Sequence, residues 1–415
     1  MLRNLVALLL ATMATTVAAQ EIVLRHALTG GAQDALSTLV VRFNDEQKGK
    51  ARVVLQDLAG VADKRKLPNL ALLDDQDTWT FFDTRPRFRS VTDILKAGGE
   101  KLNAGSFFPQ IADAVDDARG NLQALPMALT LPVLFYNKDA FAKAGLDAAS
   151  PPKTWWEVQQ AAGKLFDAGY KCPLTTSRFA WVHVENVAAQ HGEQAMVKTG
   201  RGERFVFNNL VEVKHLALLA SWQKSYYFHY FGPGREGDAK FISGDCAMLT
   251  AESSLYAELK DGQRFAAGMA ELPYYEDVYG VRPADVLPDG AALWALAGKK
   301  KDEEKVAARF IAYLMRPEVQ RQWVAGTGFL PMMPTALDSM TTAGVSPAIV
   351  DAARKRLSMP KRTNARMRSG LGRSRVREIL NEEIEFVWKN TKPAKQALDN
   401  AMERANRAPF PEPRR

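Results

Sequence analysis

One segment in the first half of the chain constrains the fold most, because it carries the signals of a buried strand and of two capped helices. Residues 132–136 form a short apolar and aromatic run, which predicts a buried strand. Asn137 can cap a helix that ends at Gly145, a residue able to adopt the left-handed conformation that often follows a helix. Thr154 and Glu157 have the spacing of a capping box for a second helix. The segment predicts a strand-helix-loop-helix unit of an α/β protein.

The N-terminal part of the chain predicts a parallel sheet. Residues 22–28 and 51–58 have the composition of strands, and apolar residues recur at helical spacing between them. A β-α-β opening of this kind favours parallel pairing. Further helices are predicted at residues 155–168, 214–223, 303–315, 317–325 and 378–388.

The first residues of the chain predict a secretory signal. Arg3 precedes an apolar stretch at residues 5–14, and Val17-Ala18-Ala19 offers a cleavage site for a signal peptidase. No later segment has the roughly 18 uninterrupted apolar residues of a transmembrane helix, and no cysteine lies near the cleavage site to carry a lipid anchor. We therefore expect residues 1–19 to be removed and the remainder to diffuse freely after export.

Length and cysteine content limit the class of protein further. A chain of 415 residues with 47% apolar and 25% charged residues can form two or three domains with a large core. Cys172 and Cys246 are its only cysteines. In an oxidising compartment such a pair forms one disulfide or stays as two buried thiols. The sequence leaves both alternatives open.

The net charge of +8 is distributed unevenly, since residues 354–377 contain ten Lys or Arg and no acid. A surface of this kind can bind the phosphates of nucleic acid, but the export signal argues against that function. A solvated basic surface is the simplest interpretation. The third is that one or two of these arginines face a cleft and bind an anion, because a guanidinium matches the geometry of a phosphate.

The sequence offers little support for catalysis. It has no HExxH, no Gly-x-Ser-x-Gly elbow, no P-loop and no Cys-x-x-Cys. The five histidines show no metal-ligand spacing: His26, His183, His191, His215 and His229. Residues 232–237 match the letters of a dinucleotide fingerprint, whose mechanism needs a strand before it and a helix opening within it. Here they follow the aromatic run at residues 226–231 and contain a proline, so we predict a loop near a cleft instead. We expect no metal, no cofactor and no enzyme activity.

Residue identities along the chain resemble those of a known family. The family pattern is carried by Tyr136-Asn137-Lys138-Asp139, Ala144-Gly145-Leu146, Pro151-Pro152, Gly244-Asp245-Cys246-Ala247-Met248, Ala292-Leu293-Trp294 and Thr327-Gly328-Phe329-Leu330-Pro331. With these motifs the chain resembles the periplasmic solute-binding proteins of ABC importers and, among them, those that bind sn-glycerol 3-phosphate. The likeness covers nearly all of the chain after the signal and is weakest at residues 57–91.

The resemblance implies an α/β fold of two discontinuous lobes with the ligand in the cleft between them. The first lobe would comprise residues 20–130 and 270–329, and the second residues 131–269 and 330–415. Hinge crossings near Thr130, Met269 and Phe329 would let the lobes close around a solute.

The resemblance also implies a set of ligand-binding residues. The first-lobe carboxylate of the family corresponds to Asp75, and a hydroxyl group to Thr130. Trp181 would pack its ring against the carbon backbone of the ligand, and Gly290 would offer a backbone N–H at close approach. Arg377 would hold the anionic group.

Two positions of this set depart from the family pattern. Phe329 replaces a tyrosine and lacks its hydroxyl group. Glu252 stands where the family has a serine, with Ser253 next to it. A carboxylate beside a buried phosphate is unfavourable unless it is paired or turned away. If Glu252 faces the cleft, a glycerophosphodiester with an amine head group fits better; if it faces away, plain glycerol 3-phosphate remains open.

The resemblance therefore predicts a periplasmic substrate-binding component of an ABC importer. It would capture sn-glycerol 3-phosphate or a glycerophosphodiester and deliver it to the membrane permease subunits, as a monomer that binds no nucleic acid. The alternatives are a binding protein for a neutral sugar or oligosaccharide and, in another class, a secreted hydrolase that uses paired acids such as Asp74-Asp75 or Glu382-Glu383.

Overall fold

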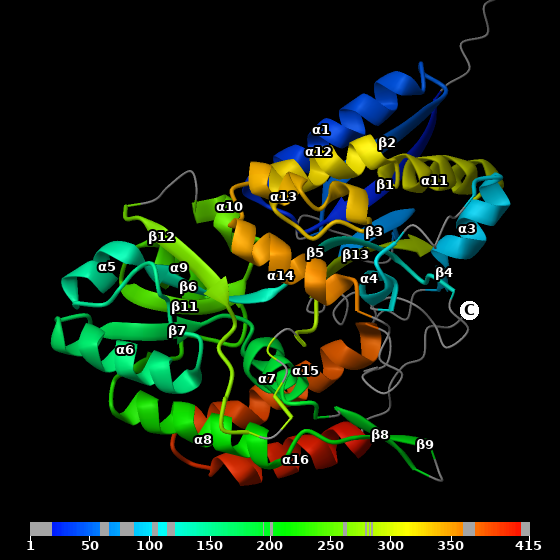
Figure 1. Ribbon diagram of the computed structural model, residues 1–415. Helices are drawn as coiled ribbons and strands as arrows, with labels where there is room; N and C mark the ends of the chain where they lie inside the picture. Colours follow the sequence, from blue (N-terminus) through cyan, green and yellow to red (C-terminus); the bar gives the residue numbers. More distant parts are fainter. Residues whose placement is uncertain are drawn as a thin grey trace, which may run out of the picture.

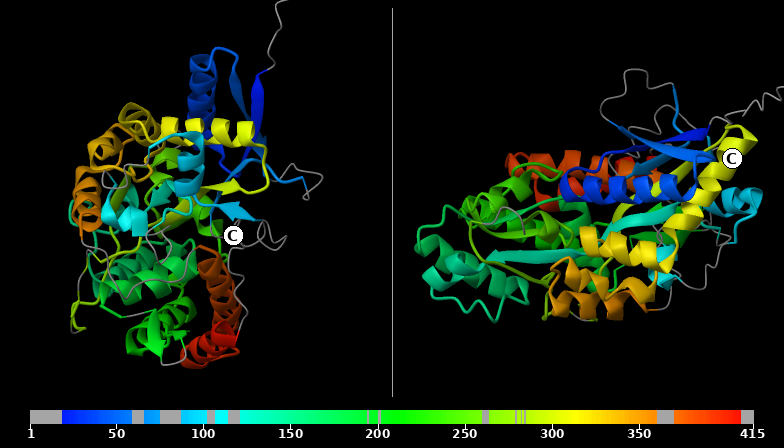
Figure 2. Two further views of the ribbon diagram at one scale, coloured as in Figure 1. Left: turned by 90° about the vertical axis from the view of Figure 1, so that its right-hand side faces the viewer. Right: turned by 90° about the horizontal axis from the view of Figure 1, so that it is seen from above.

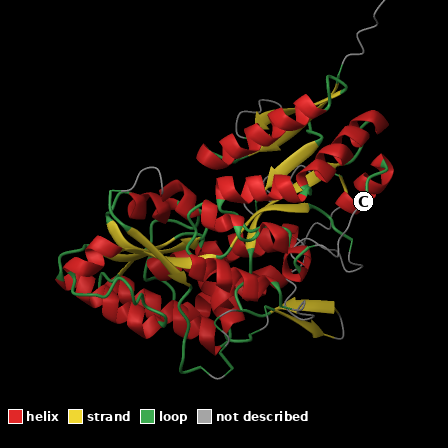
Figure 3. Ribbon diagram, turned by 45° about the horizontal axis from the view of Figure 1, so that its top comes forward, coloured by secondary structure: helices red, strands yellow, loops and turns green. Residues whose placement is uncertain are grey.

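The computed structural model describes most of the chain after the predicted signal. The described residues are 19–58, 66–74, 87–101, 107–113, 121–193, 195–199, 202–259, 264–278, 280–281, 283, 285–359 and 370–407. They form two mixed sheets, each flanked by helices, and a separate two-stranded hairpin (Figures 1 and 3). No described helix is long and apolar enough to cross a membrane.

The first sheet contains the N-terminal strands. Its order is β2 (Ala51–Asp57), β1 (Gln20–His26), β3 (Leu70–Leu73), β13 (Asp289–Leu296) and β4 (Phe88–Arg89), and β5 (Leu125–Thr130) also pairs with β13. β1 runs parallel to β2 and β3, whereas β13 is antiparallel to β3, β4 and β5. The parallel pairing predicted for the N-terminal part is therefore confirmed. Helices α1 (Gly30–Glu46), α3 (Val91–Gly98), α11 (Lys301–Leu314) and α12 (Pro317–Thr327) accompany this sheet in Figure 1.

The second sheet has the order β10 (Phe228–His229), β7 (Cys172–Thr176), β11 (Cys246–Glu252), β6 (Pro132–Asn137) and β12 (Ala267–Glu271). Its helices include α5 (Lys138–Lys143), α6 (Trp155–Asp167), α8 (Leu210–Lys224), α15 (Gly370–Trp388) and α16 (Ala394–Arg407). The C-terminal helices α15 and α16 return to this half of the molecule and pack against α8 (Figures 1 and 2). Segments far apart in the sequence thus share one core.

Short elements complete the description. They are α4 (Pro109–Asp113), the π-helix η2 (Ala180–Asn186), α7 (Val187–Gln190), the hairpin of β8 (Met196–Thr199) and β9 (Gly202–Phe205), α9 (Glu236–Ile242), α10 (Leu255–Leu259), η3 (Pro334–Ala336), α13 (Ser339–Thr342) and α14 (Pro347–Leu357). The helices predicted at residues 155–168, 214–223, 303–315, 317–325 and 378–388 are all present, and α8, α11 and α15 begin earlier than predicted.

The capped unit predicted at the start of the second sheet is confirmed. The Asn137 side-chain oxygen accepts hydrogen bonds from the N–H groups of Asp139 and Ala140, at 2.9 Å each. Gly145 follows α5 with φ of 68°, in the left-handed region. Thr154 Oγ1 accepts from the N–H of Glu157 at 3.2 Å, and the Glu157 carboxylate accepts from the N–H of Thr154 at 3.0 Å. Local signals therefore fixed both helix starts.

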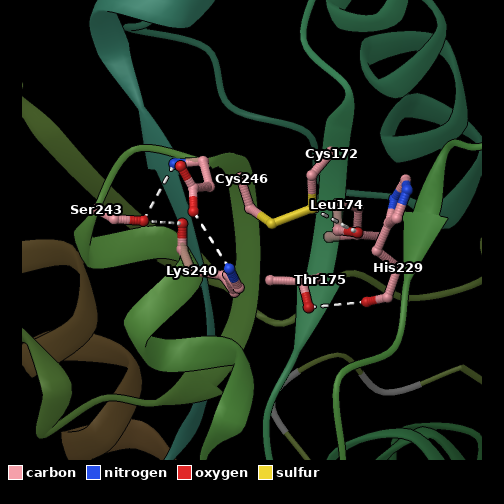
Figure 4. The surroundings of a disulfide bond; sticks show 8 residues. Cys172, Leu174, Thr175, His229, Lys240, Ser243 and Cys246 are labelled. Atoms are coloured by element: carbon pink, nitrogen blue, oxygen red, sulfur yellow. Dashed lines mark hydrogen bonds and ion pairs between the residues drawn. A yellow bond between two sulfur atoms is a disulfide. The ribbon is translucent and has the colours of Figure 1, made fainter.

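The two cysteines form a disulfide, which decides between the alternatives left open by the sequence. Cys172 begins β7 and Cys246 begins β11, and the two residues are paired in register across these parallel strands (Figure 4). The bond closes a loop with a sequence separation of 74 residues. In the chain-entropy account such a loop is worth about 4 kcal/mol of stability.

The first passage of the chain between the sheets takes a single residue, Leu131. β5 ends in the first sheet at Thr130, and β6 begins in the second sheet at Pro132. The chain returns between β12 and β13. Side chains from residues 330–357 pack in the core of the first sheet, whereas those from residues 376–405 pack in the core of the second. The residue limits given above for the two lobes stay a prediction.

Candidate functional site

A pocket of about 570 Å³ lies between the two sheets. Its walls come from both halves of the molecule: Ala27, Leu28, Thr29, Gly30, Gly31, Ala32, Leu72, Asp74, Ala128, Gly290, Ala291, Ala325, Gly326, Thr327, Phe329 and Ala343, and opposite them Arg178, Gly234, Arg235, Glu252, Ser254, Ala257 and Glu258. Several of these residues follow the carboxyl ends of β1, β3, β7 and β11, and crevices at such strand ends are the usual place for ligands in α/β proteins. The size suits a small solute.

The first-sheet side of the pocket includes the start of a long helix. α1 begins at Gly30, and the preceding Thr29 makes no side-chain capping hydrogen bond. Gly30 has φ of 55°, and neither Gly30 nor Gly31 would bring an added Cβ within 4 Å of another atom. The first N–H groups of a helix lack partners within it and carry a partial positive charge. This side can therefore accept a negatively polarised group of a solute.

The opposite side carries one end of a run of arginines and acids that we call the ion-pair chain: Glu185, Arg377, Asp289, Arg178, Glu252 and Arg235. Arg178, Glu252 and Arg235 line the pocket, whereas Glu185, Arg377 and Asp289 lie behind its wall. Arg377 Nη2 donates to Glu185 Oε2 at 2.7 Å, and Arg377 also pairs with Asp289. Arg178 Nη2 lies 2.6 Å from Asp289 Oδ2, and Arg178 also pairs with Glu252.

The ion-pair chain ends at the pocket mouth with Arg235. Its Nε lies 3.6 Å from Glu252 Oε2 and 2.9 Å from Asp238 Oδ2, and its Nη2 lies 2.8 Å from Glu258 Oε1. Burial raises the pKa of Asp238 to about 6, although Arg235 and a hydrogen bond from Ser177 lower it. Burial lowers the pKa of Arg235, but the neighbouring carboxylates more than offset this, so its pKa is raised. Arg235 therefore stays charged.

Arg178 has an unusual backbone. Its φ is 50°, a left-handed value that costs energy for a residue with a side chain. Its N–H donates to the carbonyl of Gly234 at 2.6 Å, and its guanidinium lies 4.9 Å from the ring centroid of Trp181. These contacts hold the guanidinium at the pocket. Sequence reasoning missed Arg178, because no motif marks a loop residue whose partners lie far away in the chain.

Three residues of the predicted set line the pocket. Glu252 faces it from the end of β11, and its carboxylate is paired with arginines. Gly290 has φ of 137°, and a Cβ there would lie 2.1 Å from the carbonyl oxygen of Ala128, so only glycine fits. Phe329 stacks on Trp323 with 5.8 Å between ring centroids. Their roles in ligand binding stay predictions.

Four other residues of the predicted set lie behind the pocket wall. Thr130 and Ser253 are fully buried, with 2.8 Å between their hydroxyl oxygens, and so join the two halves near the crossing. Trp181 is 1% exposed, and its Nε1 donates to the carbonyl of Leu287 at 3.0 Å. Arg377 is 4% exposed, with its guanidinium engaged by carboxylates. None of the four is among the described residues that line the pocket.

Two predictions concern segments that the structure covers only in part. Asp75 lies outside the described residues, although its neighbour Asp74 lines the pocket. Within the basic segment, Arg354 is exposed and pairs with Asp338, whereas Arg356 is buried and donates to the carbonyl of Val286. The described part of this segment therefore combines surface cations with buried ones.

The prediction of a loop near a cleft at residues 232–237 is confirmed for residues 232–235, since Gly234 and Arg235 line the pocket. It is wrong for the last two residues, because α9 begins at Glu236. Among the described residues, no group of three His, Cys, Asp or Glu side chains could hold a metal ion. The guanidinium groups, carboxylates and helix N–H groups that line the pocket can recognise polar and charged groups of a solute.

Comparison with known proteins identifies the family. The family of bacterial extracellular solute-binding proteins matches residues 42–349. The sn-glycerol-3-phosphate-binding periplasmic protein UgpB of Yersinia enterocolitica is 33% identical over 419 residues, which cover 97% of this chain and 95% of that protein. UgpB of Escherichia coli K12 is 33% identical over 420 residues, which cover 96% and 95%.

Solved structures agree on the fold. UgpB from Mycobacterium tuberculosis in complex with glycerophosphocholine has a TM-score of 0.75 and 19% identity, and covers 93% of this chain and 98% of that one. Maltose-bound MalE3 of T. maritima has a TM-score of 0.70 and 16% identity, and covers 93% and 99%. The two-lobed binding-protein fold predicted from the sequence is thus confirmed. This chain belongs to the family of bacterial extracellular solute-binding proteins.

Proposed function

We propose that this protein is the solute-binding component of an ABC importer and that its solute is a glycerol phosphate compound. The observation that carries this proposal is the 33% identity, over 97% of the chain, to a protein named for binding sn-glycerol 3-phosphate. The fold similarity to a UgpB complex with glycerophosphocholine supports the same class of solute. The protein performs no reaction; it captures the solute and delivers it to a membrane permease.

The pocket supports a solute with both charged and hydroxyl groups. Arg178 and Arg235 supply guanidinium groups, and the start of α1 supplies N–H groups for an anionic oxygen. Asp74, Glu252 and Glu258 add carboxylates that suit a cationic head group or the hydroxyl groups of a polyol. A glycerophosphodiester with an amine head group fits both: its phosphate can meet the guanidinium and N–H groups, and its amine can meet the carboxylates.

The proposal extends to the export of the protein, its location, its oligomeric state and its partners. Residues 1–19 serve as an export signal and are cleaved, since the relatives are named as periplasmic proteins. The exported protein acts in the periplasm as a monomer without a lipid anchor. It binds no nucleic acid and engages only the solute and the permease subunits.

A thermal-shift screen of protein purified from the periplasm tests the proposal. The panel contains sn-glycerol 3-phosphate, glycerophosphocholine, glycerol and maltose. A ligand at 100 times its dissociation constant adds about 2.7 kcal/mol to the free energy of unfolding, which gives a clear rise in melting temperature. We expect this rise with at least one of the two glycerol phosphate compounds. Stabilisation by maltose alone would favour a sugar-binding protein, and conversion of a chromogenic ester to product would favour a hydrolase.

A further inference from the structure

We propose that Asp289, together with Glu252, determines which glycerol phosphate compound this pocket accepts. Glu252 lines the pocket and Asp289 lies behind its wall, and both pair with Arg178, the pocket-lining guanidinium that an anionic solute would otherwise use. The pocket therefore favours a solute without net charge, such as a glycerophosphodiester with a cationic head group, over a phosphomonoester. This inference rests on the proposed function, which it narrows to one chemical class.

The position of Asp289 is the first argument. It is the first residue of β13 in the first sheet, whereas its partners Arg178 and Arg377 belong to the second half of the molecule. One carboxylate oxygen, Oδ2, accepts hydrogen bonds from both guanidinium groups. The side chains of Asp289, Arg178 and Arg377 are only 7%, 10% and 5% exposed, so solvent and salt screen these contacts weakly. An incoming phosphate would have to displace a well-placed carboxylate.

The charge balance is the second argument. The three arginines of the ion-pair chain face five carboxylates: Glu185, Asp289, Glu252, Asp238 and Glu258. A phosphomonoester carries a charge of about −1.5 to −2 near neutral pH. A phosphodiester carries a single negative charge, which an amine head group cancels. The second kind of solute adds no net negative charge beside the five carboxylates that pair with these arginines among the described residues.

The backbone around Asp289 is the third argument, since it leaves the carboxylate little freedom to withdraw. Gly290, the next residue, is pressed so closely against β5 that no side chain fits there. Arg178, its partner, is held in a left-handed conformation beside Trp181. Strained backbone of this kind is concentrated at functional sites. A purely stabilising role explains the ion-pair chain less well, because buried ion pairs often contribute little net stability.

Titration calorimetry of Asp289→Asn tests the inference. Asparagine keeps the size of the side chain and a hydrogen-bond acceptor, but it removes the negative charge beside Arg178 and Arg377. We expect the affinity for sn-glycerol 3-phosphate to rise about tenfold or more, and the affinity for glycerophosphocholine to change by less than about threefold. Inorganic phosphate serves as a second probe and should gain binding in the variant. Asp277→Asn, which removes an exposed partner of Lys214, is the matched control.

Distinct outcomes separate this inference from the proposed function. Wild-type protein that prefers sn-glycerol 3-phosphate to glycerophosphocholine, or an Asp289→Asn variant that gains no affinity for the phosphomonoester or for phosphate, overturns the inference and leaves the proposed function intact. Wild-type protein that binds neither compound overturns the proposed function. Should Asp289→Asn fail to fold, Glu252→Gln replaces it, with the same expected direction and the same overturning result.

Discussion

Two buried polar networks lie next to the same π-helix, η2, and they differ in charge. On one side His183 Nδ1 lies 2.8 Å from His215 Nε2, and His215 Nδ1 lies 2.8 Å from the hydroxyl oxygen of Tyr275. We call these three residues, with Thr176 and Thr250, the histidine network. On the other side Glu185 of η2 enters the ion-pair chain through Arg377.

The difference shows how burial acts on groups with and without opposite charges nearby. Burial lowers the pKa of His183 to about 3 and also lowers the pKa of His215 well below its usual value, so the histidine network is neutral. In the ion-pair chain, carboxylates lie against each guanidinium group, so each buried group has a partner of opposite charge. The neutral network lies inside one half of the molecule, whereas the charged one joins both halves and reaches the pocket.

The largest effect is expected when the ion-pair chain is broken. Arg377→Met leaves the carboxylates of Glu185 and Asp289 buried without this partner, and we expect the free energy of unfolding to fall by about 3–5 kcal/mol. Urea denaturation measures the change. Arg407→Met, which removes an exposed ion pair with Glu403, is the control and should cost less than about 1 kcal/mol. Equally small losses of free energy of unfolding in both variants would show that the buried ion pairs of Arg377 stabilise the fold no more than an exposed ion pair does.

The buried acid Glu212 sharpens the comparison. Burial raises the pKa of Glu212 from 4.5 to about 8, and the acid also accepts a hydrogen bond from the N–H of Asn209 at 2.9 Å. The folded state therefore holds a proton that the unfolded state releases, and stability is lost as pH rises from 4.5 towards 8. Relative to wild type, we expect Glu212→Gln to gain about 3 kcal/mol in free energy of unfolding at high pH.

The pH dependence of this gain in free energy of unfolding tests whether ionisation of Glu212 limits stability. Glutamine keeps an acceptor for the helix cap, so the variant and wild type should differ least near pH 4.5, where the acid is protonated in the folded state. Chemical denaturation at several pH values provides the comparison. A difference that stays constant with pH would mean that ionisation of Glu212 does not limit stability.

A somewhat smaller effect is expected for the histidine network. Because the pKa of His183 is lowered to about 3 from 6.5, the unfolded state takes up a proton that the folded state does not, and stability is lost as pH falls through 6.5. Between pH 6.5 and 5 this histidine accounts for about 2 kcal/mol. We expect His183→Gln to flatten the fall in free energy of unfolding over this range. If the variant loses free energy of unfolding with falling pH as steeply as wild type does, groups other than His183 account for the loss of stability in acid.

Local signals predicted the fold well, because capping and periodicity act over a few residues. Asn137, Thr154 and Glu157 cap the helices that the sequence assigned to them. The ion-pair chain could not be found in this way. Arg178 and Asp289 are separated by 111 residues, and no spacing rule connects them. Arg377 was predicted to hold an anion, but the sequence could not show that buried carboxylates from two other segments already pair with it.

Titration calorimetry of the wild-type protein with glycerophosphocholine, sn-glycerol 3-phosphate and maltose tests the central claim most directly. The predicted result is saturable binding of one glycerophosphocholine per protein, weaker binding of the phosphomonoester, and no binding of maltose. Binding of maltose, with no binding of either glycerol phosphate compound, would contradict the assignment of this pocket to glycerol phosphate solutes.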